Sequence, residues 1–173
     1  GCGSASTQEA VLMAKQAQEL RAQAILVVSP YYVKPSQAGL YQHFYAVHEA
    51  VDLPVILYNN PGRSAVDQSI DLICQLAELP KIVGLKDSSS DLNRPVLLKN
   101  RLGDRLCLLA GDDPITAAYL AQGGQGSISV TANVVPSLCQ ELIDCWQRNE
   151  TQRFQKLNQK LMVLNQTLMG DTN

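Results

Sequence analysis

The sequence lacks the long apolar segments and basic clusters that mark membrane proteins and nucleic-acid-binding proteins. No apolar run approaches the roughly 20 residues that a membrane-spanning helix needs. The first residues lack the charged and then apolar pattern of a secretory signal, and no stripe of Lys or Arg suggests nucleic-acid binding. We therefore expect a cytoplasmic protein with no membrane and no nucleic acid among its partners.

Paired cysteines are also missing. The five cysteines are odd in number and include no CxxC pair. Most of them stand in apolar helical or strand patterns, which is typical of reduced core residues. We predict neither a disulfide nor a metal site from Cys2, Cys74, Cys107, Cys139 and Cys145.

No glycine-rich nucleotide-binding fingerprint follows an apolar run. The cluster Gly123-Gly124-Gln125-Gly126 precedes such a run instead, which disfavours a nucleotide site. What the chain does contain is an ordinary globular composition of 173 residues, 46% of them hydrophobic, with a net charge of -2. This length is enough for one sizeable hydrophobic core.

Short apolar runs alternate with segments of helical period, and this alternation predicts a parallel sheet covered by helices. Ser36 and Asp113 are predicted N-caps of the helices that follow them. The last two helical segments follow each other without a strand, so they form a closing pair or begin a helical extension. The predicted strands are 24–28, 55–58, 82–86, 106–110 and 127–130, and the predicted helices are 7–22, 36–50, 67–77, 91–102, 113–122, 136–148 and 151–168.

Two architectures fit this pattern. An open doubly wound sheet would be complete in about this length, whereas a (β/α)₈ barrel needs about 250 residues and would be incomplete here. Both architectures bind ligands at the carboxyl ends of their strands. The residues that follow the predicted strands are therefore the candidates for function.

Lys86 is the most informative of these residues, because it ends the apolar run 82–85 and precedes Asp87 and three serines. Removal of a lysine amine from water disfavours its charged form, and the free amine can attack a carbonyl to form a Schiff base. The alternative is a lysine that reaches solvent along its aliphatic stem.

The other strand ends carry groups that suit the same chemistry. Tyr58 offers a phenol that can relay protons, and Arg63 offers a guanidinium that can hold a carboxylate. Each also has a purely structural alternative: an interfacial aromatic for Tyr58, a surface turn for Arg63, and a helix cap for Asp112 and Asp113. Their joint occurrence beside Lys86 favours a reactive site.

Five segments of the sequence resemble a known protein family. The segments 30–44, 57–64, 84–87, 111–113 and 126–133 are similar to the dihydrodipicolinate synthase and N-acetylneuraminate lyase family of pyruvate-dependent class I aldolases, in the family order. The resemblance implies a (β/α)₈ TIM barrel with a helical C-terminal extension. It implies further that the chain is a fragment, with a partial barrel from the end of strand 3 through strand 8 over 1–135, and the last barrel helix and the start of the helical region over 136–173.

The resemblance also implies catalytic roles. Lys86 would form the imine with pyruvate, and Tyr58 would be the phenol of the proton relay. Tyr32 would be a second relay tyrosine, contributed across a subunit interface. No cofactor is implied besides the covalent imine, and the assembly would be a homo-oligomer, a dimer of dimers.

Substrate-binding residues follow from the same resemblance. Arg63 would bind the carboxylate of aspartate semialdehyde, and Gly111 and Ile128 would line the pyruvate pocket. The implied reaction gives 4-hydroxy-tetrahydrodipicolinate in lysine biosynthesis by the diaminopimelate pathway. The chain does not contain the family's threonine pair, one hydroxyl of which joins the tyrosine relay, so the fragment alone is expected to be inactive.

Two alternatives stay open. The segment Ser88-Ser89-Ser90 departs from the family's usual Ala-Thr-Gly, and related aldolases that act on a 2-keto-3-deoxy sugar acid or on 4-hydroxy-2-oxoglutarate also vary here. Arg63 favours a substrate that ends in a carboxylate over one that ends in hydroxyls. The other alternative is a truncated, non-catalytic relic with exposed sheet edges.

Overall fold

The computed structural model describes residues 1–170, so the last three residues of the predicted helical region lie outside the described residues. Its sheet has five strands, and each strand pairs in parallel with its neighbour in sequence. A doubly wound sheet reverses its strand order, whereas this order runs on without reversal, as in a segment of a (β/α)₈ barrel. The strands are β1 (Ile25–Val28), β2 (Val55–Asn59), β3 (Ile82–Asp87), β4 (Cys107–Ala110) and β5 (Gly126–Ser127).

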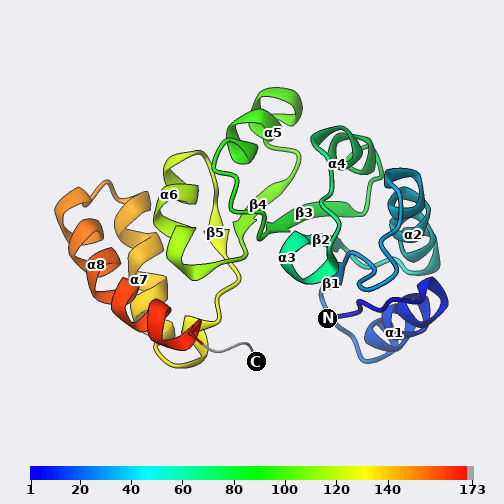
Figure 1. Ribbon diagram of the computed structural model, residues 1–173, viewed down its shortest axis with the longest axis horizontal. Coiled ribbons are helices and arrows are strands. Elements are labelled where there is room, and N and C mark those ends of the chain that lie inside the picture. Colours follow the sequence, from blue (N-terminus) through cyan, green and yellow to red (C-terminus); the bar gives the residue numbers. More distant parts are fainter. Residues whose placement is uncertain (171–173) are drawn as a thin grey trace.

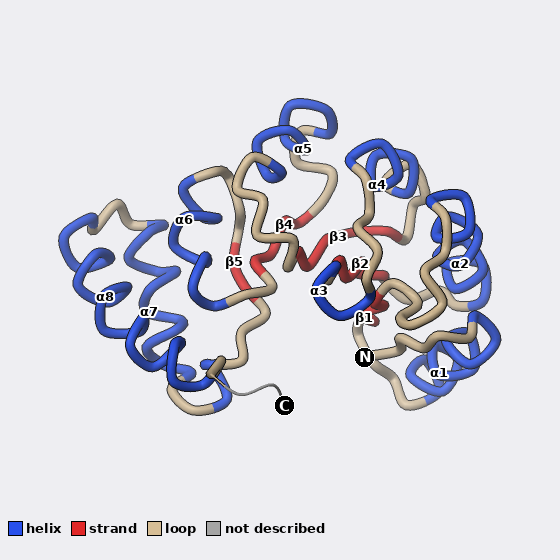
Figure 2. The backbone as a smooth tube through the Cα atoms, viewed as in Figure 1, coloured by secondary structure: helices blue, strands red, loops and turns tan. Residues whose placement is uncertain are grey.

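The larger helices lie in an arc along one side of the strands (Figure 1). Figure 2 shows the strands at the centre of this arc and the connecting loops at their ends. The helices are α1 (Thr7–Glu19), α2 (Gln37–Ala50), α4 (Ile70–Leu76), α5 (Arg94–Leu102), α6 (Thr116–Ala121), α7 (Pro136–Gln147) and α8 (Thr151–Leu168), with the short α3 (Pro61–Ser64) and the 3₁₀ turns η1 (Asp113–Ile115) and η2 (Thr131–Asn133).

The strands bury one row of side chains under the helices. Because successive strand residues point to opposite faces, residues that pair across parallel strands share a face. One such row is at most 1% exposed and belongs to the main core. Its members are Val27, Leu57, Leu85 and Leu108.

Every predicted strand and helix is present, but several boundaries differ. Strand β5 is shorter than the predicted 127–130, because the chain turns into η2 after Ser127. Helix α4 begins at Ile70 rather than at residue 67. Its N-cap is Ser69, whose hydroxyl accepts a hydrogen bond from the backbone N–H of Leu72 at 3.1 Å. The short helix α3 was not predicted.

The two predicted N-caps have different outcomes. The prediction for Ser36 is confirmed, because its hydroxyl accepts a hydrogen bond from the backbone N–H of Gly39 at 3.2 Å. The prediction for Asp113 is wrong. Its buried carboxylate accepts hydrogen bonds from the backbone N–H groups of Val130 and Thr131 at 2.9 and 3.1 Å, so it anchors the turn after β5.

The five cysteines are free thiols in different environments. Cys2 and Cys145 are buried as predicted, whereas Cys107 is exposed, so the prediction of a core position is wrong for Cys107. Cys107 lies in register with Gly84 and precedes Leu108 of the buried row, so its side chain points to the opposite face of the strand. Within residues 1–170, no helix is long and apolar enough to cross a membrane.

His43 on α2 gives the packing of α1 against α2 a dependence on pH. Its Nδ1 lies 2.9 Å from the hydroxyl of Thr7, its Nε2 has no partner among the described residues, and burial lowers its pKa from 6.5 to about 4. Between pH 6.5 and about pH 4, His43 is protonated in the unfolded chain but not in the folded chain. The free energy of unfolding therefore falls as the pH falls through this range. We expect a loss of up to about 3 kcal/mol of unfolding free energy across this window.

Chemical denaturation at about pH 7 and about pH 4.5 checks this expectation. The variant His43→Gln should lose the part of the pH dependence that His43 contributes. An identical pH dependence in the variant and the parent protein would show that the pKa of His43 is the same in the folded and the unfolded chain, and would contradict this expectation.

Candidate active site

A second row of paired residues lies on the strand face opposite the buried row. Val28, Tyr58, Lys86 and Leu109 are in register across four strands, one position beyond the buried row. The Nζ of Lys86 lies 4.3 Å from the centroid of the Tyr58 ring. The structure therefore brings together the predicted nucleophile and the predicted proton-relay phenol.

Lys86 does not reach solvent as the structural alternative required. Only 9% of the residue is exposed, so its amine is held within the site beside the Tyr58 ring. A lysine amine over an aromatic face is electrostatically favoured when it is charged. An amine attacks a carbonyl only in its uncharged form, so attack by Lys86 requires that the amine first lose its proton.

Tyr58 and Arg63 line one open pocket of about 490 Å³. The phenol oxygen of Tyr58 accepts a hydrogen bond from the Nδ2 of Asn60 at 2.8 Å. The other lining residues are Val28, Tyr31, Asn60 and Ser64. A phenol and a guanidinium on one pocket can address two ends of the same ligand.

The short helix α3 holds Arg63 at this pocket. Asn60 caps the helix, because its side-chain oxygen accepts a hydrogen bond from the backbone N–H of Arg63 at 3.2 Å. Pro61 occupies the first helical position, where its missing N–H costs no hydrogen bond. Ala65, in the left-handed conformation with φ 58°, ends the helix. The segment Asn-Asn-Pro-Gly-Arg thus forms a capped helical turn, and this turn places the Arg63 guanidinium at the pocket.

Tyr32 does not join Tyr58 within this chain. It is 90% exposed and has a φ of 72°, which is costly for a residue with a side chain. Its neighbour Tyr31 lines the pocket instead. The relay role of Tyr32 across a subunit interface stays a prediction.

Gly111 and Ile128 lie at the carboxyl ends of β4 and β5 but not among the residues that line the pocket with Tyr58. A Cβ on Gly111 would lie 2.1 Å from the Oγ of Ser88 and 3.0 Å from the backbone of Asp87. Glycine therefore permits close packing of the loops after β3 and β4. The pyruvate-lining role of both residues stays a prediction.

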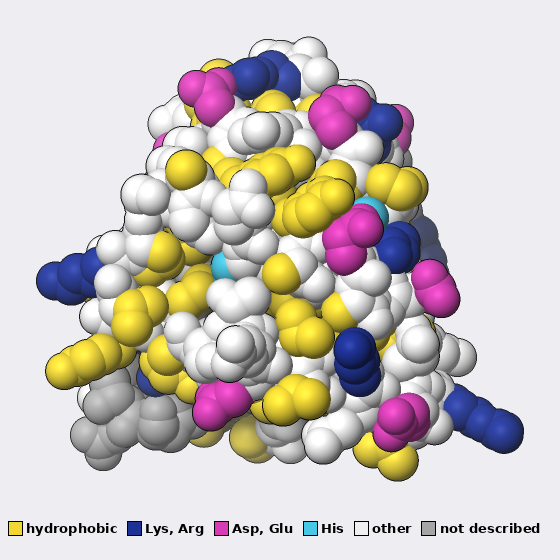
Figure 3. Space-filling view, turned by 90° about the vertical axis from the view of Figure 1, so that its right-hand side faces the viewer, with side chains coloured by type: hydrophobic (Ala, Val, Ile, Leu, Met, Phe, Trp, Pro, Cys, Tyr) yellow, Lys and Arg dark blue, Asp and Glu magenta, His cyan; other side chains and the backbone are white. Residues whose placement is uncertain are grey.

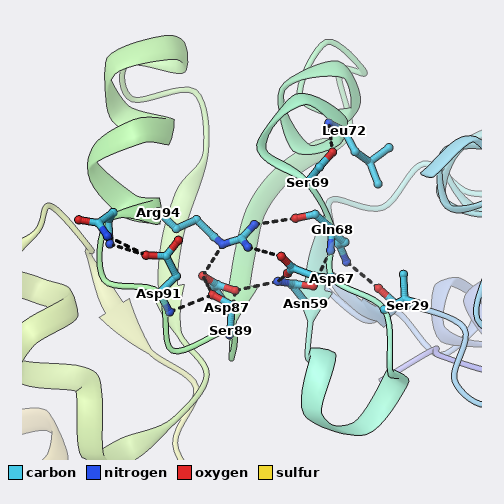
Figure 4. Close-up of polar contacts among 12 residues, drawn as sticks. Ser29, Asn59, Asp67, Gln68, Ser69, Leu72, Asp87, Ser89, Asp91 and Arg94 are labelled. Carbon is cyan, nitrogen blue, oxygen red and sulfur yellow. Dashed lines mark hydrogen bonds and ion pairs between the residues drawn. The ribbon is translucent and has the colours of Figure 1, made fainter. Parts of the chain in front are cut away.

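A buried polar network on the helix side of the sheet was missed by sequence reasoning (Figure 4). Asn59 and Asp87 are paired in register directly after Tyr58 and Lys86, and the Nδ2 of Asn59 donates to the Oδ1 of Asp87 at 3.0 Å. The side chains of Asn59 and Asp87 point to the face opposite that of Tyr58 and Lys86. Their hydrogen bond therefore joins the ends of β2 and β3 without entering the pocket face.

Arg94 on α5 completes this network. Its guanidinium donates to the backbone oxygen of Gln68 and to the Oδ2 of Asp67, both at 2.6 Å, and its Nε lies 3.4 Å from the Oδ2 of Asp87. Burial raises the pKa of Asp87, and Arg94 opposes that rise, as do hydrogen bonds from Asn59 and Ser89. Nothing in the local pattern around Arg94 signals these partners, which come from distant segments.

Ser89 explains one part of the departure from the family pattern after Lys86. Its backbone N–H and hydroxyl both donate to the carboxylate of Asp87, at 3.2 and 2.9 Å. Among residues 1–170, no group of three or more His, Cys, Asp or Glu side chains could hold a metal ion. The described site offers the amine of Lys86, the phenol of Tyr58 and the guanidinium of Arg63.

Known proteins resemble this chain over its whole length. The model of the dihydrodipicolinate synthetase family matches residues 1–173. The 4-hydroxy-tetrahydrodipicolinate synthase of Rhodospirillum centenum is 48% identical over the whole chain. A solved dihydrodipicolinate synthase from Acinetobacter baumannii, complexed with pyruvate, is 43% identical with a TM-score of 0.95, and the enzyme from Aquifex aeolicus is 40% identical with a TM-score of 0.97.

These relatives are longer than the chain. The match covers all of the chain but 60% of the Rhodospirillum protein, 60% of the Acinetobacter structure and 59% of the Aquifex structure.

Proposed function

The chain belongs to the dihydrodipicolinate synthetase family, and on that premise we propose that the intact protein condenses pyruvate with aspartate semialdehyde to give 4-hydroxy-tetrahydrodipicolinate. The observation that carries this proposal is the position of the Lys86 amine, 4.3 Å from the Tyr58 ring and in register with it on adjacent strands. The names of the relatives support the choice of reaction and do not favour the alternative aldolases or a non-catalytic relic.

The proposed chemistry begins with a covalent bond between Lys86 and pyruvate. The uncharged amine attacks the keto carbon, and the resulting carbinolamine loses water to give an iminium ion. The iminium withdraws electrons from the methyl carbon, which loses a proton to become an enamine. The enamine carbon then attacks the aldehyde carbon of the second substrate: the C=O π bond opens to an alkoxide, which takes up a proton, and the iminium to Lys86 is restored. Attack on this iminium by water or by the amino group of the aspartate semialdehyde part then releases the product and returns the free amine of Lys86.

Tyr58 serves the proton transfers of this sequence. A phenol near Lys86 can donate a proton to the leaving hydroxyl of the carbinolamine and can take a proton back at a later step. In the proposal, Tyr32 of a neighbouring subunit extends this relay. No cofactor takes part, since the iminium is the electron sink.

We propose that the five strands form part of a (β/α)₈ barrel in a homo-oligomer located in the cytoplasm. Continuous strand order supports the barrel. Figure 3 shows hydrophobic side chains spread over the face formed by α1 and α2, and the exposed large hydrophobic residues include Leu12, Tyr45 and Tyr32. Exposed apolar side chains of this kind suit an interface between copies of the chain.

Arg63 is the proposed clamp for the carboxylate of aspartate semialdehyde. In Arg63→Ala we expect kcat/KM for this substrate to fall roughly 10- to 150-fold, because a charge-assisted pair contributes about 1.5–3 kcal/mol. Arg63→Lys should recover only part of the loss, because a lysine lacks the planar fork. Steady-state kinetics with saturating pyruvate measures the effect.

The matched control is imine formation with pyruvate alone, which both variants should retain. An unchanged kcat/KM in Arg63→Ala would reject the carboxylate clamp.

A further inference from the structure

The side chain of Asn60 connects the two functional residues of the pocket. Its oxygen accepts a hydrogen bond from the backbone N–H of Arg63 at 3.2 Å, and its Nδ2 lies 2.8 Å from the phenol oxygen of Tyr58. Asn60 is 8% exposed, and its two hydrogen bonds lie, partly buried, in the wall of the pocket.

The contact with Arg63 fixes the orientation of the amide. A backbone N–H can only donate, so the group that faces it must be the amide oxygen. The NH₂ group is therefore the one that faces Tyr58. Since an amide NH₂ can only donate, the phenol oxygen of Tyr58 accepts this bond, and its own proton is directed to another partner.

This arrangement has a chemical consequence for a proton relay. When the phenol gives up its proton, its oxygen gains negative charge, and the bond from Asn60 becomes charge-assisted and stronger. The donor therefore stabilises the state reached during proton transfer more than the resting state, which is the condition for lowering a barrier.

We propose that Asn60 is a positioning residue that supports proton transfer by Tyr58 and fixes the phenol relative to the Arg63 loop. This inference rests on the proposed function. Helix capping by itself does not require asparagine, because serine and aspartate cap helices equally well. An amide supplies the acceptor for Arg63 and the donor for Tyr58 on two separate atoms, which neither a serine hydroxyl nor an aspartate carboxylate does.

Three variants of Asn60 separate capping from proton transfer. Asn60→Asp keeps an acceptor for the cap but has no donor for Tyr58. Asn60→Ser also keeps an acceptor, but its hydroxyl takes the place of Cγ, one bond short of the Nδ2 that contacts Tyr58. Asn60→Ala loses both groups. The readouts are the thermal midpoint and the exchange of pyruvate methyl hydrogens for deuterium, which needs the imine and a proton relay but no aldehyde.

We expect the exchange rate at saturating pyruvate to fall roughly 10- to 100-fold in Asn60→Ser, with KM for pyruvate changed less than about threefold. Asn60→Asp should be slower still, because its carboxylate repels the charge that develops on the phenol. The thermal midpoint should fall most in Asn60→Ala. A purely structural role predicts the opposite: near-normal exchange in Asn60→Ser and Asn60→Asp, with a loss only in Asn60→Ala.

Borohydride trapping of the pyruvate imine separates this inference from the proposed function. If the parent protein forms the adduct and Asn60→Ser exchanges deuterium at the parent rate, the role of Asn60 is overturned while the proposed function stands. If the parent protein forms no adduct, both are overturned.

Discussion

Replacing Lys86 with methionine is expected to lower the rate of condensation by at least about 10⁴-fold, because no other described group can take over a covalent nucleophile at this position. Methionine keeps the length and the apolar stem of the lysine side chain. Because Lys86 is only 9% exposed, an apolar side chain suits this buried position, and the fold should tolerate the change. The variant removes the amine and little else.

The kinetic signature of this loss is specific. Because the imine precedes every later step, kcat and kcat/KM should both fall, and deuterium exchange into pyruvate should disappear with them. Lys156→Met on the exposed surface of α8 is the matched control and should keep the parent rate. A Lys86→Met protein that retained more than about one-tenth of the parent activity would exclude the imine mechanism at this residue.

Replacing Arg94 with methionine is expected to cost about 3–5 kcal/mol of unfolding free energy, because it leaves Asp87 buried without its cation. Asp87 is 1% exposed and Arg94 is 5% exposed, so solvent cannot compensate for the loss. The backbone oxygen of Gln68 also loses the donor that Arg94 supplies at 2.6 Å. Denaturant titration of the intact protein measures the change.

The control for Arg94 lies on the same helix. Arg101 of α5 also donates to a carboxylate, that of Asp71 at 2.6 Å, but this pair is on the surface. Arg101→Met should therefore change stability far less. Equal losses in Arg94→Met and Arg101→Met would show that burial of the Arg94 network does not matter.

The Arg94 effect should also depend on pH. Arg94 lowers the pKa of Asp87, so its removal moves that pKa further upward and makes the ionised carboxylate costlier in the fold. Protonation removes this cost, so the difference in stability between parent and variant should be smaller at about pH 5 than at about pH 8. A constant difference would contradict the ionised state of Asp87.

The sequence predicted the strand ends well because parallel strands bring their carboxyl ends to one edge. Lys86, Tyr58 and Arg63 could be grouped on that basis. The common strand face of Lys86 and Tyr58 could not be predicted, because it depends on an irregularity in the pairing of β2 with β3: Val55 pairs with Ile82, but Ile56 pairs with Gly84. The extra residue, Val83, shifts the alternation and is invisible in a continuous apolar run.

The buried polar residues were the least predictable part of the site. Arg94 contacts carboxylates 7 and 27 positions away, on a strand end and on a loop. Asp113 looks like a cap in sequence, yet its carboxylate holds the turn after β5. Partners of this kind are set by tertiary packing and not by local propensity. The proposed partner of Tyr32 lies on another subunit, so its position depends on packing between subunits as well as within the chain.

Borohydride reduction of the intact protein in the presence of pyruvate tests the central claim most directly. The account predicts that the peptide containing Lys86 gains the mass of a reduced pyruvate adduct, and that Lys86→Met gains none. A parent protein that gains no mass, or gains it on another lysine, would contradict the account.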